Sequence, residues 1–90
     1  MRRDEPSVRA EAPEARFLGS LAVGEEATVR AFRLPRALTR RLLELGLLPG
    51  TRVRVVRRAP LGDPIELRLR NYALSIGCEE ASRIEVDSLG

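Results

Sequence analysis

Catalytic and metal-binding side chains are scarce in this 90-residue chain, which contains no histidine and a single cysteine, Cys78. Histidine is the commonest general acid–base group in enzymes. The usual tetrahedral zinc sites are built from several cysteine and histidine ligands, which this chain cannot supply, and a tight site for another first-row transition metal is not expected either. The sequence therefore predicts that the protein is not an enzyme and that it has no catalytic residue, no cofactor and no dedicated metal site.

The residues that remain for chemistry are Cys78 and the adjacent carboxylates Glu79 and Glu80. The two carboxylates could bind a hard cation weakly. Adjacent acidic residues are more often a solvated surface or the first turn of a helix, which is the interpretation we favour. A nucleophilic Cys78 would need a neighbour that stabilises its thiolate, and a structural role is favoured for this residue too.

Residues 59–64, with the sequence APLGDP, predict a rigid turn. Pro60 and Pro64 fix their own φ angles and keep the residues before them out of the helical region. Gly62 is free to adopt a positive φ, which leucine or aspartate would resist. Leu61 places one large apolar side chain near the tip. The loop is therefore expected to serve packing, recognition or both.

One helix is expected after residue 34, because leucines recur there at helical spacing. The leucines of this stripe are Leu34, Leu38, Leu42 and Leu45. Pro35 suits the first helical position, and Gly46 lies where a left-handed residue would end the helix. Pro49 then prevents the helix from continuing.

Alternating apolar and polar residues predict short strands elsewhere in the chain. The expected strands span residues 26–32, 51–57, 65–70, 72–76 and 83–86, with a turn at Asn71 and a turn or single helical turn at 77–82. Short antiparallel strands of this kind usually bend into a small barrel, which removes exposed edges. We therefore predict a mainly β fold: a small barrel of about five strands with one helix between the first two.

The composition indicates one small domain with a flexible N-terminal tail. Hydrophobic residues make up 43% of the chain, enough for a core. Residues 1–16 mix charges and prolines without a period, so the domain is expected at 17–87, with a short C-terminal tail at 88–90. No apolar run approaches the ~18 residues that span a bilayer, and no signal-peptide pattern is present. With a single cysteine, these features predict a cytoplasmic protein without membrane insertion.

Five motifs, in register, resemble the FeoA family (ferrous-iron transport protein A). The motifs are Leu45-Gly46-Leu47 followed by Pro49-Gly50, the 59–64 loop, Tyr72-Ala73-Leu74-Ser75, and Glu80-Ala81 followed by Ile84. The resemblance covers Phe17 to Asp87 and implies an SH3-like barrel. Asn71 stands where the family usually has glycine, and Gly77-Cys78 replaces positions that are often basic.

The resemblance implies a regulatory adaptor of FeoB, a ferrous-iron transporter with a cytoplasmic GTP-binding domain, acting by protein–protein contact. Weak self-association is a further expectation. The candidate contact residues are Leu47, Leu48, Arg57, Arg58, Pro60, Leu61 and Asp63. For Leu47 we favour the alternative that it plugs the end of the barrel. For Leu61, core packing and partner contact are equally supported.

Three alternatives remain open. The first is nucleic-acid binding by the arginines at 52, 54, 57, 68 and 70, but Glu66 interrupts them and few aromatic residues are available for base stacking. A solvated face is favoured, so no nucleic-acid partner is expected. The second is a regulatory domain like the C-terminal domain of iron-dependent repressors, although the chain has no room for a helix-turn-helix domain. The third is an arginine supplied to the GTP-binding domain by Arg57 or Arg58.

Overall fold

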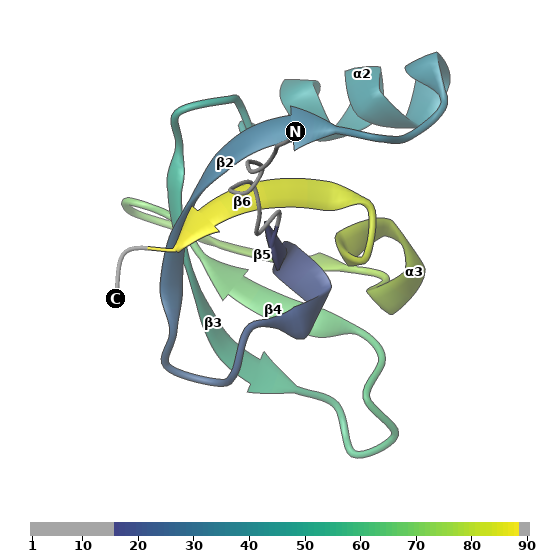
Figure 1. The fold of residues 1–90 in the computed structure, drawn as a ribbon. Helices are drawn as coiled ribbons and strands as arrows, with labels where there is room; N and C mark the ends of the chain where they lie inside the picture. Colours follow the sequence, from purple (N-terminus) through teal and green to yellow (C-terminus); the bar gives the residue numbers. More distant parts are fainter. Residues whose placement is uncertain (1–15, 89–90) are drawn as a thin grey trace, which may run out of the picture.

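Six antiparallel strands form one strongly curved sheet in the computed structural model, which describes residues 16–88 (Figure 1). The strands are β1 (Arg16–Phe17), β2 (Glu26–Phe32), β3 (Arg52–Arg58), β4 (Ile65–Arg68), β5 (Ala73–Ile76) and β6 (Ile84–Ser88). Their order across the sheet is β1-β6-β2-β3-β4-β5. The helical segments are the 3₁₀ turn η1 (Leu18–Ser20) and the helices α2 (Arg36–Glu44) and α3 (Cys78–Ala81). The mainly β fold, with its principal helix between two long strands, was predicted correctly.

Strand β1 is a strand that the sequence did not predict. It has two residues and pairs Arg16 with Val86 and Phe17 with Glu85. So short a strand carries no alternating pattern, and it exists because β6 supplies hydrogen-bonding partners. The expected tail therefore loses Arg16 to the sheet, and Ser88 belongs to β6. The rest of the two predicted tails, residues 1–15 and 89–90, lies outside the described part of the chain.

Two irregularities in the ladders help to curve the sheet. The register shifts between Val29 and Ala31 where β2 pairs with β6, and between Val55 and Arg57 where β3 pairs with β4. An extra residue of this kind bends a strand and increases its twist. Apolar side chains of the inner face then meet in one core, which includes Val29, Val55 and Ile65.

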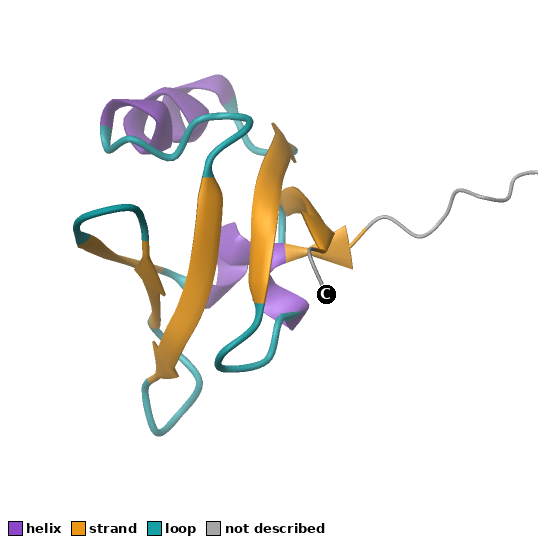
Figure 2. Ribbon diagram, turned by 90° about the vertical axis from the view of Figure 1, so that its left-hand side faces the viewer, coloured by secondary structure: helices purple, strands orange, loops and turns teal. Residues whose placement is uncertain are grey.

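The curved sheet closes into a barrel without a continuous ladder of hydrogen bonds. Within residues 16–88, β1 and β5 are the two edges and no ladder joins them. Instead, the helical turns that follow these strands, η1 and α3, pack on each other. Gly19 allows this contact, since a Cβ there would lie 3.1 Å from the backbone nitrogen of Ser82. Figure 2 shows both turns together near the middle of the view, whereas α2 lies at the top, at one end of the sheet.

Helix α2 ends in a Schellman motif that carries Leu47 into the core. Gly46 adopts φ +99°, and its N–H donates to the Leu43 carbonyl at 3.0 Å. The N–H of Leu47 reaches back to the Leu42 carbonyl at 3.0 Å. Leu42 and Leu47 are both buried, which supplies the apolar contact typical of this motif. The cap at Gly46 was predicted, whereas Pro35 is the N-cap and not the first helical residue.

Candidate functional site

The loop between β3 and β4 has the fixed shape that its prolines predicted. The Ala59 N–H donates to the Pro64 carbonyl at 3.1 Å, and the Gly62 N–H donates to the Ala59 carbonyl at 2.7 Å. Gly62 adopts φ +88°. Leu61 is 96% exposed, so its packing interpretation is wrong and a large apolar side chain stands in solvent on a closed turn.

Asp63 and Cys78 anchor this loop to α3. A carboxylate oxygen of Asp63, Oδ1, accepts the backbone N–H of Cys78 at 2.8 Å, in the first turn of α3. The Cys78 thiol donates to the Gly62 carbonyl at 3.2 Å. The N-terminal N–H groups of a helix lack partners within the helix, so a carboxylate there is stabilising. Asp63, a candidate contact residue, therefore has a structural role that its sequence position did not reveal.

The remaining carboxylates near Cys78 behave as the sequence indicated. Glu79 and Glu80 lie in the first turn of α3. Glu79 is 3.5 Å from Arg83, and Glu80 is 4.0 Å from Arg41. Within residues 16–88, no group of three or more cysteine or acidic side chains is arranged to hold a metal ion.

Leu47 is wrong as a partner-contact residue, because the structure buries it completely. The Schellman motif turns it inward, as the alternative interpretation proposed. Leu48 is 49% exposed and faces solvent in the loop before β3. It lies at the opposite end of β3 from Pro60 and Leu61, so the predicted contact residues divide into two surfaces.

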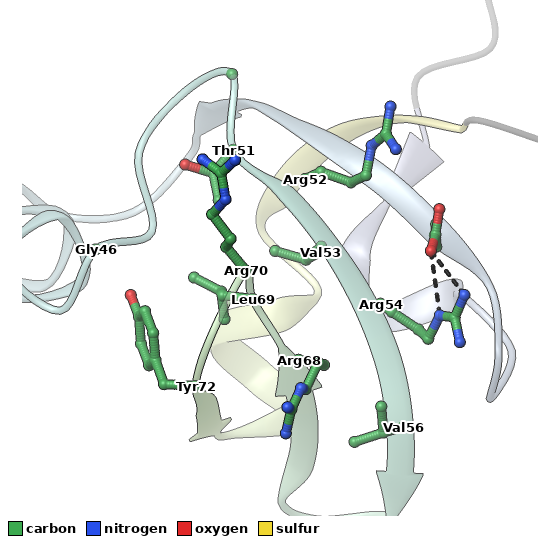
Figure 3. Close-up of a pocket in the computed structure, with 12 residues that line it drawn as sticks. Gly46, Thr51, Arg52, Val53, Arg54, Val56, Arg68, Leu69, Arg70 and Tyr72 are labelled. Atoms are coloured by element: carbon green, nitrogen blue, oxygen red, sulfur yellow. Dashed lines mark hydrogen bonds and ion pairs between the residues drawn. The ribbon is translucent and has the colours of Figure 1, made fainter.

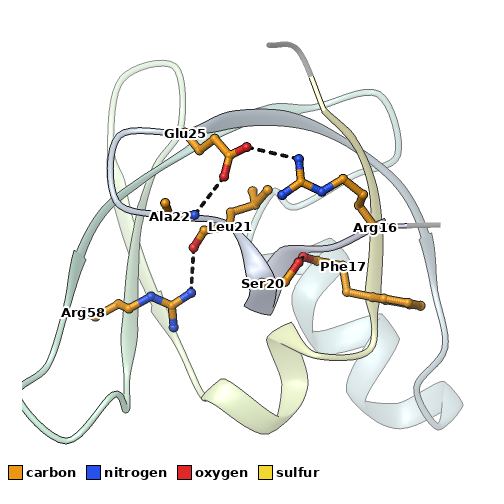
Figure 4. A network of polar contacts seen from close by, with 7 residues as sticks. All are labelled: Arg16, Phe17, Ser20, Leu21, Ala22, Glu25 and Arg58. Carbon is orange, nitrogen blue, oxygen red and sulfur yellow. Dashed lines mark hydrogen bonds and ion pairs between the residues drawn. The ribbon is translucent and has the colours of Figure 1, made fainter. Parts of the chain in front are cut away.

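Arg58 braces the start of the domain (Figure 4). Its Nη2 atom donates to the carbonyls of Gly19 and Leu21, each at 2.7 Å. These carbonyls belong to η1 and the residue after it, so Arg58 ties β3 to the turn that helps to close the sheet. Arg57 is different: its guanidinium is exposed and lies 3.8 Å from Glu66. Of the two arginines considered for partner contact, Arg57 is thus the accessible one.

Glu25 completes the polar network shown in Figure 4. Its carboxylate accepts the Ala22 N–H at 2.8 Å and the Arg16 guanidinium at 3.1 Å. The backbone hydrogen bond from Ala22, followed by the interaction with Arg16, holds the pKa of Glu25 below its ordinary value of 4.5. The network fixes the turn between η1 and β2.

Apart from the β3–β4 loop and Leu48, the domain has an open groove along the outer face of β3 and β4, with a volume of about 900 Å³ (Figure 3). Its basic side chains are Arg52, Arg54, Arg68 and Arg70. Sequence alternation had placed these arginines on one face but had also included Arg57, which does not line the groove. Tyr72 forms one wall, and its hydroxyl donates to the Leu45 carbonyl at 2.7 Å.

The strongly curved antiparallel sheet of residues 16–88, with its few short helices, defines a small SH3-like barrel. The FeoA domain model matches residues 17–88, and the chain belongs to the FeoA family. In the same described range, no helix has the length and apolar character needed to cross a membrane.

One curated relative is the Fe(2+) transport protein A/Fe(2+) transporter FeoB fusion protein of Porphyromonas gingivalis. It is 34% identical over 70 residues, which are 78% of this chain and 8% of that protein. The chain therefore spans only a small part of this relative.

Solved structures agree on the fold. FeoA from Chlorobium tepidum has a TM-score of 0.79 and 39% identity over 83% of this chain and 71% of its own. Stenotrophomonas maltophilia FeoA, an SH3 domain protein complexed with zinc, has a TM-score of 0.69 and 31% identity over 81% of this chain and 91% of its own. A manganese-dependent transcriptional repressor shares the fold at a TM-score of 0.77 and 24% identity, over 87% of this chain and 38% of its own.

Proposed function

We propose that this protein is a cytoplasmic, non-enzymatic regulator of a FeoB-type ferrous-iron transporter, and that it acts by binding the transporter's cytoplasmic GTP-binding domain. The observation that carries the proposal is the relative in which a FeoA segment and a FeoB transporter form one chain. Covalent linkage gives two binding modules a high effective concentration. A FeoA domain without such a linkage would depend on the affinity of its own surface for the partner.

The surface that supports this contact is the β3–β4 loop. Leu61 is exposed, and the backbone beneath it is closed by hydrogen bonds and tied to α3 through Asp63 and Cys78. A loop that is already ordered loses little conformational entropy on binding. An exposed aliphatic side chain on such a loop suits an apolar pocket of a partner.

The decisive experiment is titration calorimetry of the full chain against the cytoplasmic domain of its cognate transporter, with and without a non-hydrolysable GTP analogue. We expect binding, and we expect Leu61→Asp to weaken it by about 2 kcal/mol or more, the range of a binding hot spot. Val23→Asp is the matched control, because Val23 is 58% exposed in a different turn and receives the same charge.

Three results would contradict the proposal. Absence of heat in both nucleotide states would remove the GTP-binding domain as the partner. Equal weakening by Leu61→Asp and Val23→Asp would remove the β3–β4 loop as the contact surface. Loss of cooperative unfolding in Leu61→Asp would place Leu61 in the core and invalidate its use as a surface probe.

A further inference from the structure

The arginine groove on β3 and β4 has a charge arrangement that folding alone disfavours. Arg54 and Arg68 are direct partners across the β3–β4 ladder. Like charges opposite each other on neighbouring strands destabilise a sheet. Arg52 and Arg70 extend the same positive groove beyond this pair (Figure 3).

Several arginines outside the groove have polar partners, which Arg52, Arg68 and Arg70 of the groove lack within residues 16–88. Arg30 lies 3.1 Å from Asp87, Arg33 lies 3.2 Å from Glu85, and Arg58 binds two carbonyls. Within residues 16–88, Arg52, Arg68 and Arg70 have no carboxylate within ion-pair distance. Outside the groove, the arginines of the same range that lack a carboxylate partner are Arg36 and Arg40 on α2 and Arg58, which binds carbonyls instead. The positive charges of the groove are therefore concentrated and largely uncompensated within the described structure.

One carboxylate already in the groove shows which ligand geometry its arginines accept. Glu26 Oε2 receives the Nε and Nη2 donors of Arg54 at 3.2 and 2.8 Å. A guanidinium presents several N–H donors in one plane, which suits carboxylates. Arg52, Arg68 and Arg70 carry the same donors and line the same groove.

The residues that line the groove between the arginines favour a peptide ligand over a nucleic acid. Val56 is half-buried and adds apolar surface among the charged side chains, whereas Leu69 lines the groove but is almost completely buried. Tyr72 is the single aromatic residue of the groove, and the Leu45 carbonyl holds its hydroxyl. Surfaces that bind single-stranded nucleic acids use aromatic side chains on which successive bases stack. One fixed ring does not provide such a series, whereas charged side chains beside the apolar surface of Val56 suit a polypeptide.

We propose that this groove binds an acidic segment of a partner protein, rich in aspartate or glutamate, through Arg52, Arg68 and Arg70. The inference goes beyond the proposed function, since it concerns a surface away from Leu61 and does not depend on which protein carries the segment. The groove lies along β3, and the loop that carries Leu61 follows the end of the same strand. One partner can therefore engage both surfaces, yet either contact can fail without the other.

The test uses hexaglutamate as the probe and the isotopically labelled full chain as the receptor, followed by NMR chemical shifts at low ionic strength. We expect shift changes centred on groove residues. Arg68→Gln/Arg70→Gln should weaken the affinity about tenfold or more, since two charge-assisted contacts are lost. Arg30→Gln/Arg33→Gln removes the same charge from partnered arginines and should change the affinity less than about twofold.

Each other outcome would overturn the inference. Equal weakening by the two double variants would show general charge attraction. Tighter binding of an oligothymidylate with the same number of negative charges would show a nucleic-acid groove. Absence of shift changes with hexaglutamate would show that the groove takes no acidic peptide. Hexaglutamine is the uncharged control and should produce no binding.

Discussion

Arg57 and Arg58 are adjacent in the sequence and have opposite roles in the structure. Both were candidates for partner contact, and both carry the same side chain. Arg58 points to the carbonyls of Gly19 and Leu21, whereas Arg57 has an exposed guanidinium near Glu66. The two arginines therefore separate structural from surface effects within one strand.

We expect Arg58→Ala to destabilise the domain by about 1.5–3 kcal/mol, the range for hydrogen bonds from a charged donor. The free energy of unfolding of Arg57→Ala should stay within about 0.5 kcal/mol of the wild-type value, as is usual for exposed substitutions. Urea unfolding followed by circular dichroism measures both. Similar free energies of unfolding for the two variants would mean that the Arg58 bridge to η1 does not stabilise the fold.

At the scale of elements, the end of α2 depends on a close approach between Gly46 and Tyr72. A Cβ at position 46 would collide with the Tyr72 hydroxyl, which donates to the Leu45 carbonyl. Gly50 provides the comparison, because it has a similar φ of +92° and a Cβ there would meet no atom within 4 Å. Gly46 is thus required both for its positive φ and for the space that Tyr72 occupies, whereas Gly50 is required only for its positive φ.

Gly50→Ala should cost about 1–2 kcal/mol, because a left-handed residue with a Cβ is strained. Gly46→Ala should cost more, since it also displaces Tyr72 and its hydrogen bond, which adds about 0.5–1.5 kcal/mol. Thermal unfolding of the two variants gives the order. A smaller effect at Gly46 than at Gly50 would show that Tyr72 moves aside freely.

The β3–β4 loop shows how far local sequence rules reach. Pro60, Gly62 and Pro64 were sufficient to predict a fixed turn, because each residue constrains its own backbone or that of its neighbour. The hydrogen bond from Cys78 to Asp63 was not predictable, because the two residues are 15 positions apart and meet only when α3 packs beside the loop.

At the scale of the whole molecule, the arginine groove lies along β3, and the loop that carries Leu61 follows the end of that strand. The sheet is closed by packing of η1 on α3. Self-association, expected from exposed strand edges, stays a prediction; β1 and β5 are the edges available for it within residues 16–88. The network around Glu25 supports the closure, since it fixes the turn that leads from η1 into β2.

Acid should weaken this closure through Glu25. Its pKa is lower in the folded protein than its ordinary value of 4.5, so its contribution to stability is present above that value and is lost as the pH falls through the folded-state pKa. Glu25→Gln removes this titration, and its melting temperature should fall less than that of wild type between neutral and acid pH. Thermal melts across this interval measure the difference. Parallel curves would show that Glu25 does not contribute to the acid sensitivity.

Elements with local causes could be predicted from the amino-acid sequence without any coordinates. The leucine spacing and Gly46 defined the helix and its end, alternation defined the main strands, and the ordered motifs defined the FeoA family. Each of these depends on residues a few positions apart, or on a pattern shared with relatives.

Which candidate contact residues are structural became clear only from the folded arrangement of the chain. For Leu47, the interpretation favoured from the sequence, burial at the end of the barrel, is confirmed. Arg58 is bound to η1 and Asp63 is bound to α3, although both resembled surface residues in the sequence. The same holds for the groove, where the β3–β4 register places Arg54 opposite Arg68. These roles depend on contacts between residues far apart in the chain, which the local pattern of side chains does not specify.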